Sequence, residues 1–309
     1  MKNLIIIVAV VILVGLGAYW FMGGWQRDAG IVDIKRDQGT TTDVTKTPGN
    51  GQTAVVSPVV QNKVETVIGK SVEGRDITAY HYGTGDKEIL LVGGVHGGYS
   101  WNTALVAYEI MDYLKANPGT VPGNIKVTVI PVLNPDGLYK VVGATAGFTK
   151  ADVSPSQAVQ VSGRFNANDV DLNRNFDCEW QKTGMWQSKT VSGGSAAFSE
   201  PESVALKNYV EAHRPAAAVV FFSSAGGVFS SSCGGGILAA TTALTNLYAK
   251  AAGYPAYKSF DFYATTGDMV NWLAKKEIPA ISVLLTNHTD TEWTKNWAGI
   301  KAALDYYAK

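Results

Sequence analysis

Short apolar runs that alternate with helical segments constrain the fold of this chain more than any other feature. Four runs are mainly apolar and lack the strict alternation of a strand with one solvent-facing side: residues 88–92, 125–132, 217–222 and 279–285. Helical patterns occupy residues 103–114, 201–213, 242–253, 267–277 and 297–308. Strands that are apolar on both faces must be covered on both faces. We therefore predict an α/β fold, a three-layer sandwich around a mixed, mostly parallel sheet.

Polar residues follow the predicted strands at their carboxyl ends. His96 comes shortly after the strand at 88–92, and Ser223 comes directly after the strand at 217–222. In open α/β sheets, binding sites lie outside the carboxyl ends of the strands. We therefore expect these side chains to belong to one site.

The charge balance excludes one class of partner. Lys and Arg residues number 26, as do Asp and Glu residues, so the formal net charge is zero. A nucleic-acid-binding protein needs a basic surface to neutralise phosphates. No nucleic acid is therefore predicted as a partner.

The N-terminal part differs from the rest of the chain. An uncharged apolar run extends from Leu4 to Met22, and a membrane-spanning helix needs about 20 such residues. We predict a transmembrane anchor at residues 1–22, a flexible polar linker at residues 23–62 and a folded domain at residues 63–309. This makes the protein a single-pass cell-membrane protein with its domain outside the cytoplasm. The alternative is a cleaved signal peptide, although the run is long for one.

Two cysteines, Cys178 and Cys233, are present. In an exported domain the simplest expectation is that they form a disulfide. Spacing alone does not determine pairing, so two buried free thiols remain the alternative.

Five stretches of the predicted domain carry further motifs: VHGGYSWNT (95–103), LNPDG (133–137), GRFNANDVDLNRNF (163–176), FSEPES (198–203) and TTGDMVNWLAKKEIPAISVLL (265–285). In this order and spacing they resemble the zinc carboxypeptidases of the carboxypeptidase A-like family, across nearly all of residues 64–305. The resemblance implies an α/β sandwich with a mixed sheet of about eight strands and a shallow funnel at one end.

The resemblance also implies a reaction. Members of that family hold zinc with a His and a Glu from one loop and a second His at the end of a later strand. A distant Glu acts as general base on the zinc-bound water, and an Arg binds the terminal carboxylate of the substrate. Three N/O ligands leave the metal an open position, and the metal lowers the pKa of its bound water to about 7.

These roles carry over to this chain unevenly. His96 matches the first zinc ligand, but Ser100 stands at the position of the acidic ligand and Ser223 at that of the second histidine. Leu284 occupies the position of the catalytic glutamate. Serine hydroxyls are poor zinc ligands, and loss of a general base alone typically costs about 10²–10⁴-fold in rate. We therefore expect a vestigial metal site, no bound cofactor and a catalytically inactive domain.

The substrate-binding residues of the family are matched more completely than its zinc ligands. The predicted substrate-binding residues are Asn173, Arg174, Tyr263 and Arg164. A guanidinium at the end of a strand suits bidentate binding of a carboxylate, and the tyrosine matches one that closes over the substrate terminus in the family. In the alternative interpretation, Arg174 only braces the end of the sheet against Asp171 or Asp177.

These features favour a tethered domain that binds peptide C-termini, with cell-wall peptides as one candidate ligand. One alternative is a working zinc carboxypeptidase with shifted ligands, built from His288 with Asp290 or Glu292. Another is a structural or docking domain without a small ligand. A serine nucleophile at Ser223 is not favoured, because no base is recognisable and the G-x-S-x-G elbow is missing from this stretch.

Overall fold

A mixed sheet runs through the part of the chain that this computed structural model describes, residues 64–309. Its eight strands lie in the order β1 (Glu65–Lys70), β2 (Asp76–Tyr82), β4 (Ile125–Ile130), β3 (Lys87–Val92), β7 (Ala217–Ser223), β10 (Ala280–Leu285), β8 (Gly227–Ser230) and β9 (Ala256–Tyr257). The four central strands from β4 to β10 are parallel. Strands β1, β2 and β8 join antiparallel to their inner neighbours. The predicted mixed sheet of about eight strands is confirmed.

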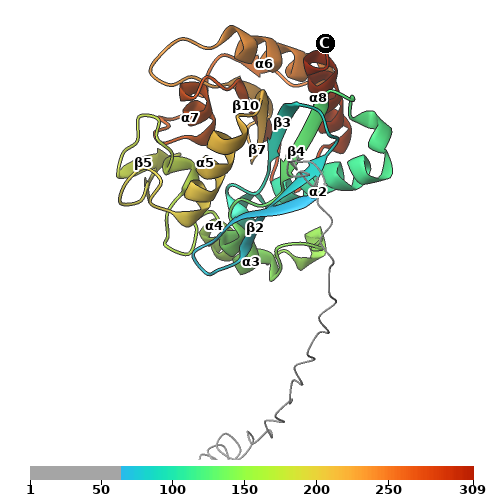
Figure 1. Cartoon of the computed structure of the whole chain (residues 1–309). Coiled ribbons are helices and arrows are strands. Elements are labelled where there is room, and N and C mark those ends of the chain that lie inside the picture. Colours follow the sequence, from blue (N-terminus) through green and yellow to red (C-terminus); the bar gives the residue numbers. More distant parts are fainter. Residues whose placement is uncertain (1–63) are drawn as a thin grey trace, which may run out of the picture. The chain divides into compact units, whose positions relative to one another are not determined.

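Helices cover both faces of the sheet (Figure 1). One face packs against α2 (Trp101–Ala116), α6 (Ala239–Ala252) and α8 (Trp293–Tyr307). The other face packs against α5 (Pro201–His213) and α7 (Met269–Lys275). Each central strand therefore has apolar residues on both sides, which explains the continuous apolar runs in the sequence.

A third apolar cluster lies beside the sheet. Here α3 (Pro135–Val142) and the N-terminal end of α2 pack together, with α4 (Gln157–Ser162) alongside. The remaining short 3₁₀ segments are η1 (Gly97–Ser100), η2 (Pro118–Thr120), η3 (Lys150–Asp152) and η4 (Leu172–Arg174). A separate hairpin is formed by β5 (Thr183–Trp186) and β6 (Lys189–Ser192).

The strand and helix boundaries follow local chemistry. Strand β4 stops at Ile130, short of the predicted end, because Pro131 has no backbone N–H for the ladder. The NPDG stretch begins α3: the Asn134 side chain accepts a hydrogen bond from the N–H of Gly137, and Pro135 takes the first helical position.

The predicted membrane anchor and linker, residues 1–22 and 23–62, lie outside the described residues. Within residues 64–309, none of the helices has both the length and the apolar character needed to cross a membrane. The anchor therefore stays a prediction.

Candidate functional site

A cavity of about 520 Å³ opens at the carboxyl ends of β7 and β10. Nearly all the predicted site residues line it: His96, Arg164, Asn173, Arg174, Ser223, Tyr263 and Leu284. Ser100 does not line the cavity and is 1% exposed. The sheet order brings these segments together, because β3, β7 and β10 are parallel neighbours and end at the same edge.

The loop that carries His96 is held by glycines. Gly97 has a φ of +43°, and a Cβ there would lie 2.6 Å from the carbonyl oxygen of Gly163. A larger residue would therefore displace the loop. The loop closes into the 3₁₀ turn η1, which leads directly into α2.

His96 is a buried imidazole without a hydrogen-bond partner on either ring nitrogen. Its ring lies 5.3 Å from that of Phe222, and its Nε2 lies 3.6 Å from Asp171 Oδ1. Burial, followed by the positive charge of Arg164, lowers the pKa of His96 well below 6.5, so this imidazole is neutral at physiological pH. The hydroxyl of Ser100 is likewise buried and unpartnered.

Ser223 ends β7 within a polar network. Its Oγ lies 2.9 Å from His288 Nδ1 and 3.1 Å from Asn102 Oδ1. The Asn102 side chain in turn donates to the backbone carbonyls of Asn287 and Asp290. Asn102 was missed in the sequence, because an asparagine within a helical pattern gives no sign of a partner 121 residues away.

His288 reaches the cavity, but the carboxylates considered with it do not join it. Asp290 is exposed and accepts a hydrogen bond from Asn287. Glu292 accepts from the backbone N–H of Thr286 and from the hydroxyl of Tyr254. These contacts place neither carboxylate beside the His288 ring, which weakens the shifted-ligand alternative.

Leu284, which we aligned with the catalytic glutamate of the family, forms an apolar floor of the cavity. It is 8% exposed and lies beside Phe222 of β7 and Gly227 of β8 in the sheet register. Leu284 has no group that can accept a proton from water.

Arg164 belongs to a buried ion pair. Its Nε and Nη2 lie 2.9 Å and 2.8 Å from Asp171 Oδ2. Its guanidinium also stacks on Trp186, 4.5 Å from the ring centre. Burial alone would raise the pKa of Asp171, but the charges of Arg164 and Arg174 outweigh burial and lower it to about 2.

Arg174 is buried without a carboxylate at salt-bridge distance among the described residues. Three of its N–H groups are used: Nε and Nη2 donate to the carbonyl of Met185, and Nη1 donates to the carbonyl of Asn173. A guanidinium has five N–H groups, so two are left without a hydrogen-bond partner among the described residues. The bracing alternative is not supported, since Asp171 pairs with Arg164 and Asp177 with Lys275.

Asn173 has a structural role. Its Nδ2 donates to Asp268 Oδ2, and its Oδ1 accepts from the backbone N–H of Met269. The side chain thus fixes the start of α7 against the segment that carries Arg174. Tyr263 stands nearby, with its ring centre 5.8 Å from the Arg174 guanidinium carbon.

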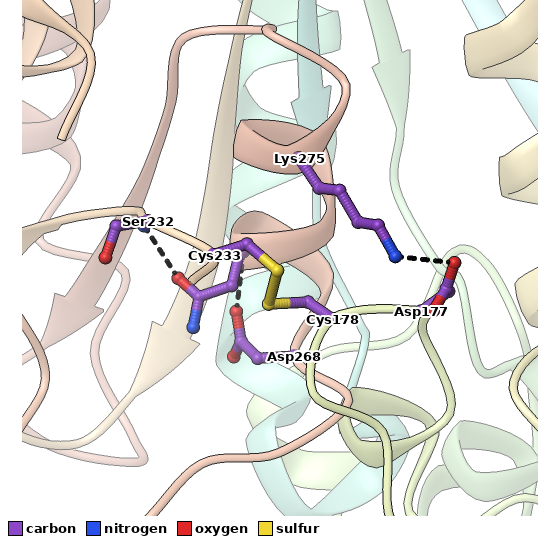
Figure 2. Close-up of a disulfide and its surroundings, with 7 residues drawn as sticks. Asp177, Cys178, Ser232, Cys233, Asp268 and Lys275 are labelled. Atoms are coloured by element: carbon purple, nitrogen blue, oxygen red, sulfur yellow. Dashed lines mark hydrogen bonds and ion pairs between the residues drawn. A yellow bond between two sulfur atoms is a disulfide. The ribbon is translucent and has the colours of Figure 1, made fainter. Parts of the chain in front are cut away.

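A disulfide joins Cys178 to Cys233, as predicted, with a Cα–Cα distance of 5.8 Å. Figure 2 shows the disulfide beside the ion pair between Lys275 and Asp177, in which Nζ lies 2.9 Å from Oδ2. The bond connects the chain just after Arg174 to the loop after β8. Both of these segments contribute walls of the cavity.

Comparison with known proteins identifies the class. The sequence model of the zinc carboxypeptidase family matches residues 60–290. The chain belongs to this family, as the motifs predicted.

Individual relatives are distant. Carboxypeptidase D of Homo sapiens is 29% identical over 148 residues, 43% of this chain and 10% of that protein. Gamma-D-glutamyl-L-diamino acid endopeptidase 1 of Lysinibacillus sphaericus is 28% identical over 160 residues, 46% of this chain and 40% of that protein. The crystal structure of carboxypeptidase A from Helicoverpa armigera is similar with a TM-score of 0.61 at 21% identity, covering 79% of this chain and 68% of the other. The chain thus spans well under half of these curated relatives.

Family membership corrects one expectation. We expected no cofactor, but the matching family is one of zinc carboxypeptidases, so that expectation is wrong. The fit of the chain to zinc is nevertheless incomplete: residues 64–309 contain no group of three or more His, Cys, Asp or Glu side chains that could hold a metal ion. His96, which we predicted as the first zinc ligand, would supply one donor, short of the three that zinc enzymes use. The described residues therefore do not fit a catalytic zinc site.

Proposed function

We propose that the domain binds peptide C-termini and lacks the peptide hydrolysis of its family. Arg174 carries this proposal. It is a buried cation on the cavity wall, it has two uncommitted N–H groups, and the described carboxylates leave it without an ion-pair partner. A terminal carboxylate would satisfy both N–H groups with a bidentate pair.

The ligand is distinguished by its free carboxylate. The full chain should bind a peptide acid about 10- to 100-fold more tightly than the same peptide with an amidated C-terminus, because a charge-assisted pair contributes about 1.5–3 kcal/mol. Isothermal titration calorimetry measures both. Equal affinities for the acid and the amide would contradict the proposal and favour a docking domain.

A variant pair locates the contact. Arg174→Lys keeps the charge but loses the fork, so affinity for the peptide acid should fall about 10-fold while amide binding stays the same. Lys301→Gln is the matched control, since Lys301 is a half-exposed cation paired with Asp305 on α8. Thermal melts of both variants show whether the fold is retained.

Cell-wall peptides are the ligand class we favour. The relative from Lysinibacillus sphaericus is named for peptides with a D-glutamyl and a diamino-acid residue, and cell-wall stem peptides share that chemistry. A stem peptide with a free carboxylate should therefore bind more tightly than an unrelated peptide acid of equal length. The reverse order would remove cell-wall peptides from the proposal.

Loss of hydrolysis rests on Leu284, Ser100 and Ser223 at the positions of catalytic and ligand side chains. We expect no release of C-terminal residues by the purified protein in buffer with added zinc. The triple variant Ser100→Glu, Ser223→His and Leu284→Glu should bind zinc more tightly than the parent. If it folds and binds zinc no better, Ser100 and Ser223 do not face His96.

We also propose that Leu4–Met22 anchors the domain outside the cytoplasm. The uncharged run and the disulfide support this, since disulfides form in oxidising compartments. The protein should stay in the membrane fraction after an alkaline wash. Recovery in the soluble fraction as a shortened chain would instead favour a cleaved signal peptide.

A further inference from the structure

Ser223 and His288 form a hydroxyl–imidazole pair that neither zinc binding nor peptide binding requires. Ser223 Oγ lies 2.9 Å from His288 Nδ1, within hydrogen-bond reach, and both residues line the cavity. Nucleophilic serines are activated by a base at this separation. In the sequence the serine had no base, because its partner lies 65 residues further along the chain.

Asn102 holds the pair in place. Its Nδ2 has two hydrogens, which go to the carbonyls of Asn287 and Asp290 on either side of His288. This arrangement turns its Oδ1 toward Ser223 Oγ. The single hydroxyl hydrogen of Ser223 is donated either to this Oδ1, 3.1 Å away, or to His288 Nδ1, 2.9 Å away, and nucleophilic attack requires the second orientation. One side chain therefore orients both the hydroxyl and the loop that carries the imidazole, which makes Asn102 a positioning residue.

The imidazole is further fixed by an aromatic contact and is able to accept a proton. The His288 ring packs edge-on against Tyr99, with ring centres 4.6 Å apart. Burial, followed by the charge of Arg164, lowers the pKa of His288, so the ring is mainly neutral near pH 7.

We propose that Ser223 is a nucleophile, with His288 as its general base, that reacts with acyl esters in the cavity. In the first step the Oγ–carbon bond forms while the hydroxyl proton passes to His288 Nδ1. The carbon–oxygen bond of the ester then breaks, and the leaving alcohol takes that proton. Water hydrolyses the acyl-serine through the same base, releasing the carboxylic acid and restoring Ser223.

A fluorophosphonate probe tests the pair directly on the full chain. Its reaction forms a bond from serine oxygen to phosphorus and releases fluoride, with the proton passing to the base. Peptide mass spectrometry should locate the adduct at Ser223. Ser224 is the matched control, because it is exposed, lines the same cavity and is the adjacent hydroxyl.

The variants give distinct outcomes. Ser223→Ala should abolish labelling, Ser224→Ala should leave it unchanged, and His288→Gln should slow it about 100-fold. Hydrolysis of p-nitrophenyl acetate should change in the same order. Thermal melts check that each variant is folded. If His288→Gln is unfolded, the pH dependence of the parent replaces it: the labelling rate of the parent should rise with pH to a plateau, with a midpoint below 6.5. An adduct at Ser224, no adduct at all, or a rate without pH dependence would overturn the proposal.

Discussion

Removal of the disulfide between Cys178 and Cys233 should be one of the most destabilising small changes in this domain. The bond closes a loop with a sequence separation of 55 residues. In the chain-entropy treatment, a loop of this length restricts the unfolded chain by about 4 kcal/mol. For a domain of about 250 residues, each kcal/mol lowers the melting temperature by about 2 °C, so the variant Cys178→Ala/Cys233→Ala should melt about 8 °C below the parent.

Differential scanning calorimetry measures this loss, and thiol labelling of denatured, unreduced protein checks the bond. The parent should show almost no free thiol. Each single variant already breaks the bond, so the double variant should melt close to either single one. The reasoning fails if the double variant melts within about 2 °C of the parent, or if the losses of the two single variants add. Additive losses would mean that each side chain acts through its own packing.

Three other changes test the site and its supports. The pKa of Asp171, about 2 in the folded protein against an ordinary 3.8, means that its ionised form stabilises the fold above pH 3.8. This contribution, about 2 kcal/mol, is lost as the pH falls toward 2. Thermal melts should show a flatter acid profile for Asp171→Asn, and parallel profiles would argue against the ion pair. Gly267→Ala should destabilise the protein well beyond Gly253→Ala in urea unfolding. Both glycines have a positive φ, +64° at Gly267 and +70° at Gly253. A Cβ at Gly267 would lie 2.2 Å from the Arg174 carbonyl oxygen, whereas nothing lies within 4 Å of a Cβ at Gly253. Leu284→Glu should lower the free energy of unfolding by about 2 kcal/mol at pH 8 and by less at pH 5, where the buried carboxyl is neutral. If the melting temperature falls equally at both pH values relative to the parent, the side chain at position 284 is solvated and not buried.

The central strands were predictable from the sequence because burial on both faces requires a continuous apolar run. Residues 217–222 and 279–285 were recognised in this way and form β7 and β10, next to each other in the sheet. Short or exposed elements were missed: α3, the hairpin of β5 and β6, and strands β8 and β9. They span only two to eight residues each, so an apolar period cannot develop along them and their local pattern does not separate them from loops.

The sequence alone led us to align His96, Ser100, Ser223 and Leu284 with the ligand and catalytic positions of the family, and this alignment stays a prediction. The disulfide could be expected from the presence of two cysteines in a chain that we predicted to be exported. The family itself, and with it the architecture, also followed from motifs spread over nearly the whole domain.

The partners of these residues were decided only by the tertiary structure. Asp171 was available to either nearby arginine in the sequence, yet in the fold it pairs with Arg164 and leaves Arg174 with two uncommitted N–H groups. Ser223 lies beside His288 because the parallel pairing of β7 and β10 brings the loops after both strands to one edge. Local sequence patterns report which faces are buried, but they do not encode the order of strands in a sheet. Contacts between residues far apart in the chain depend on that order.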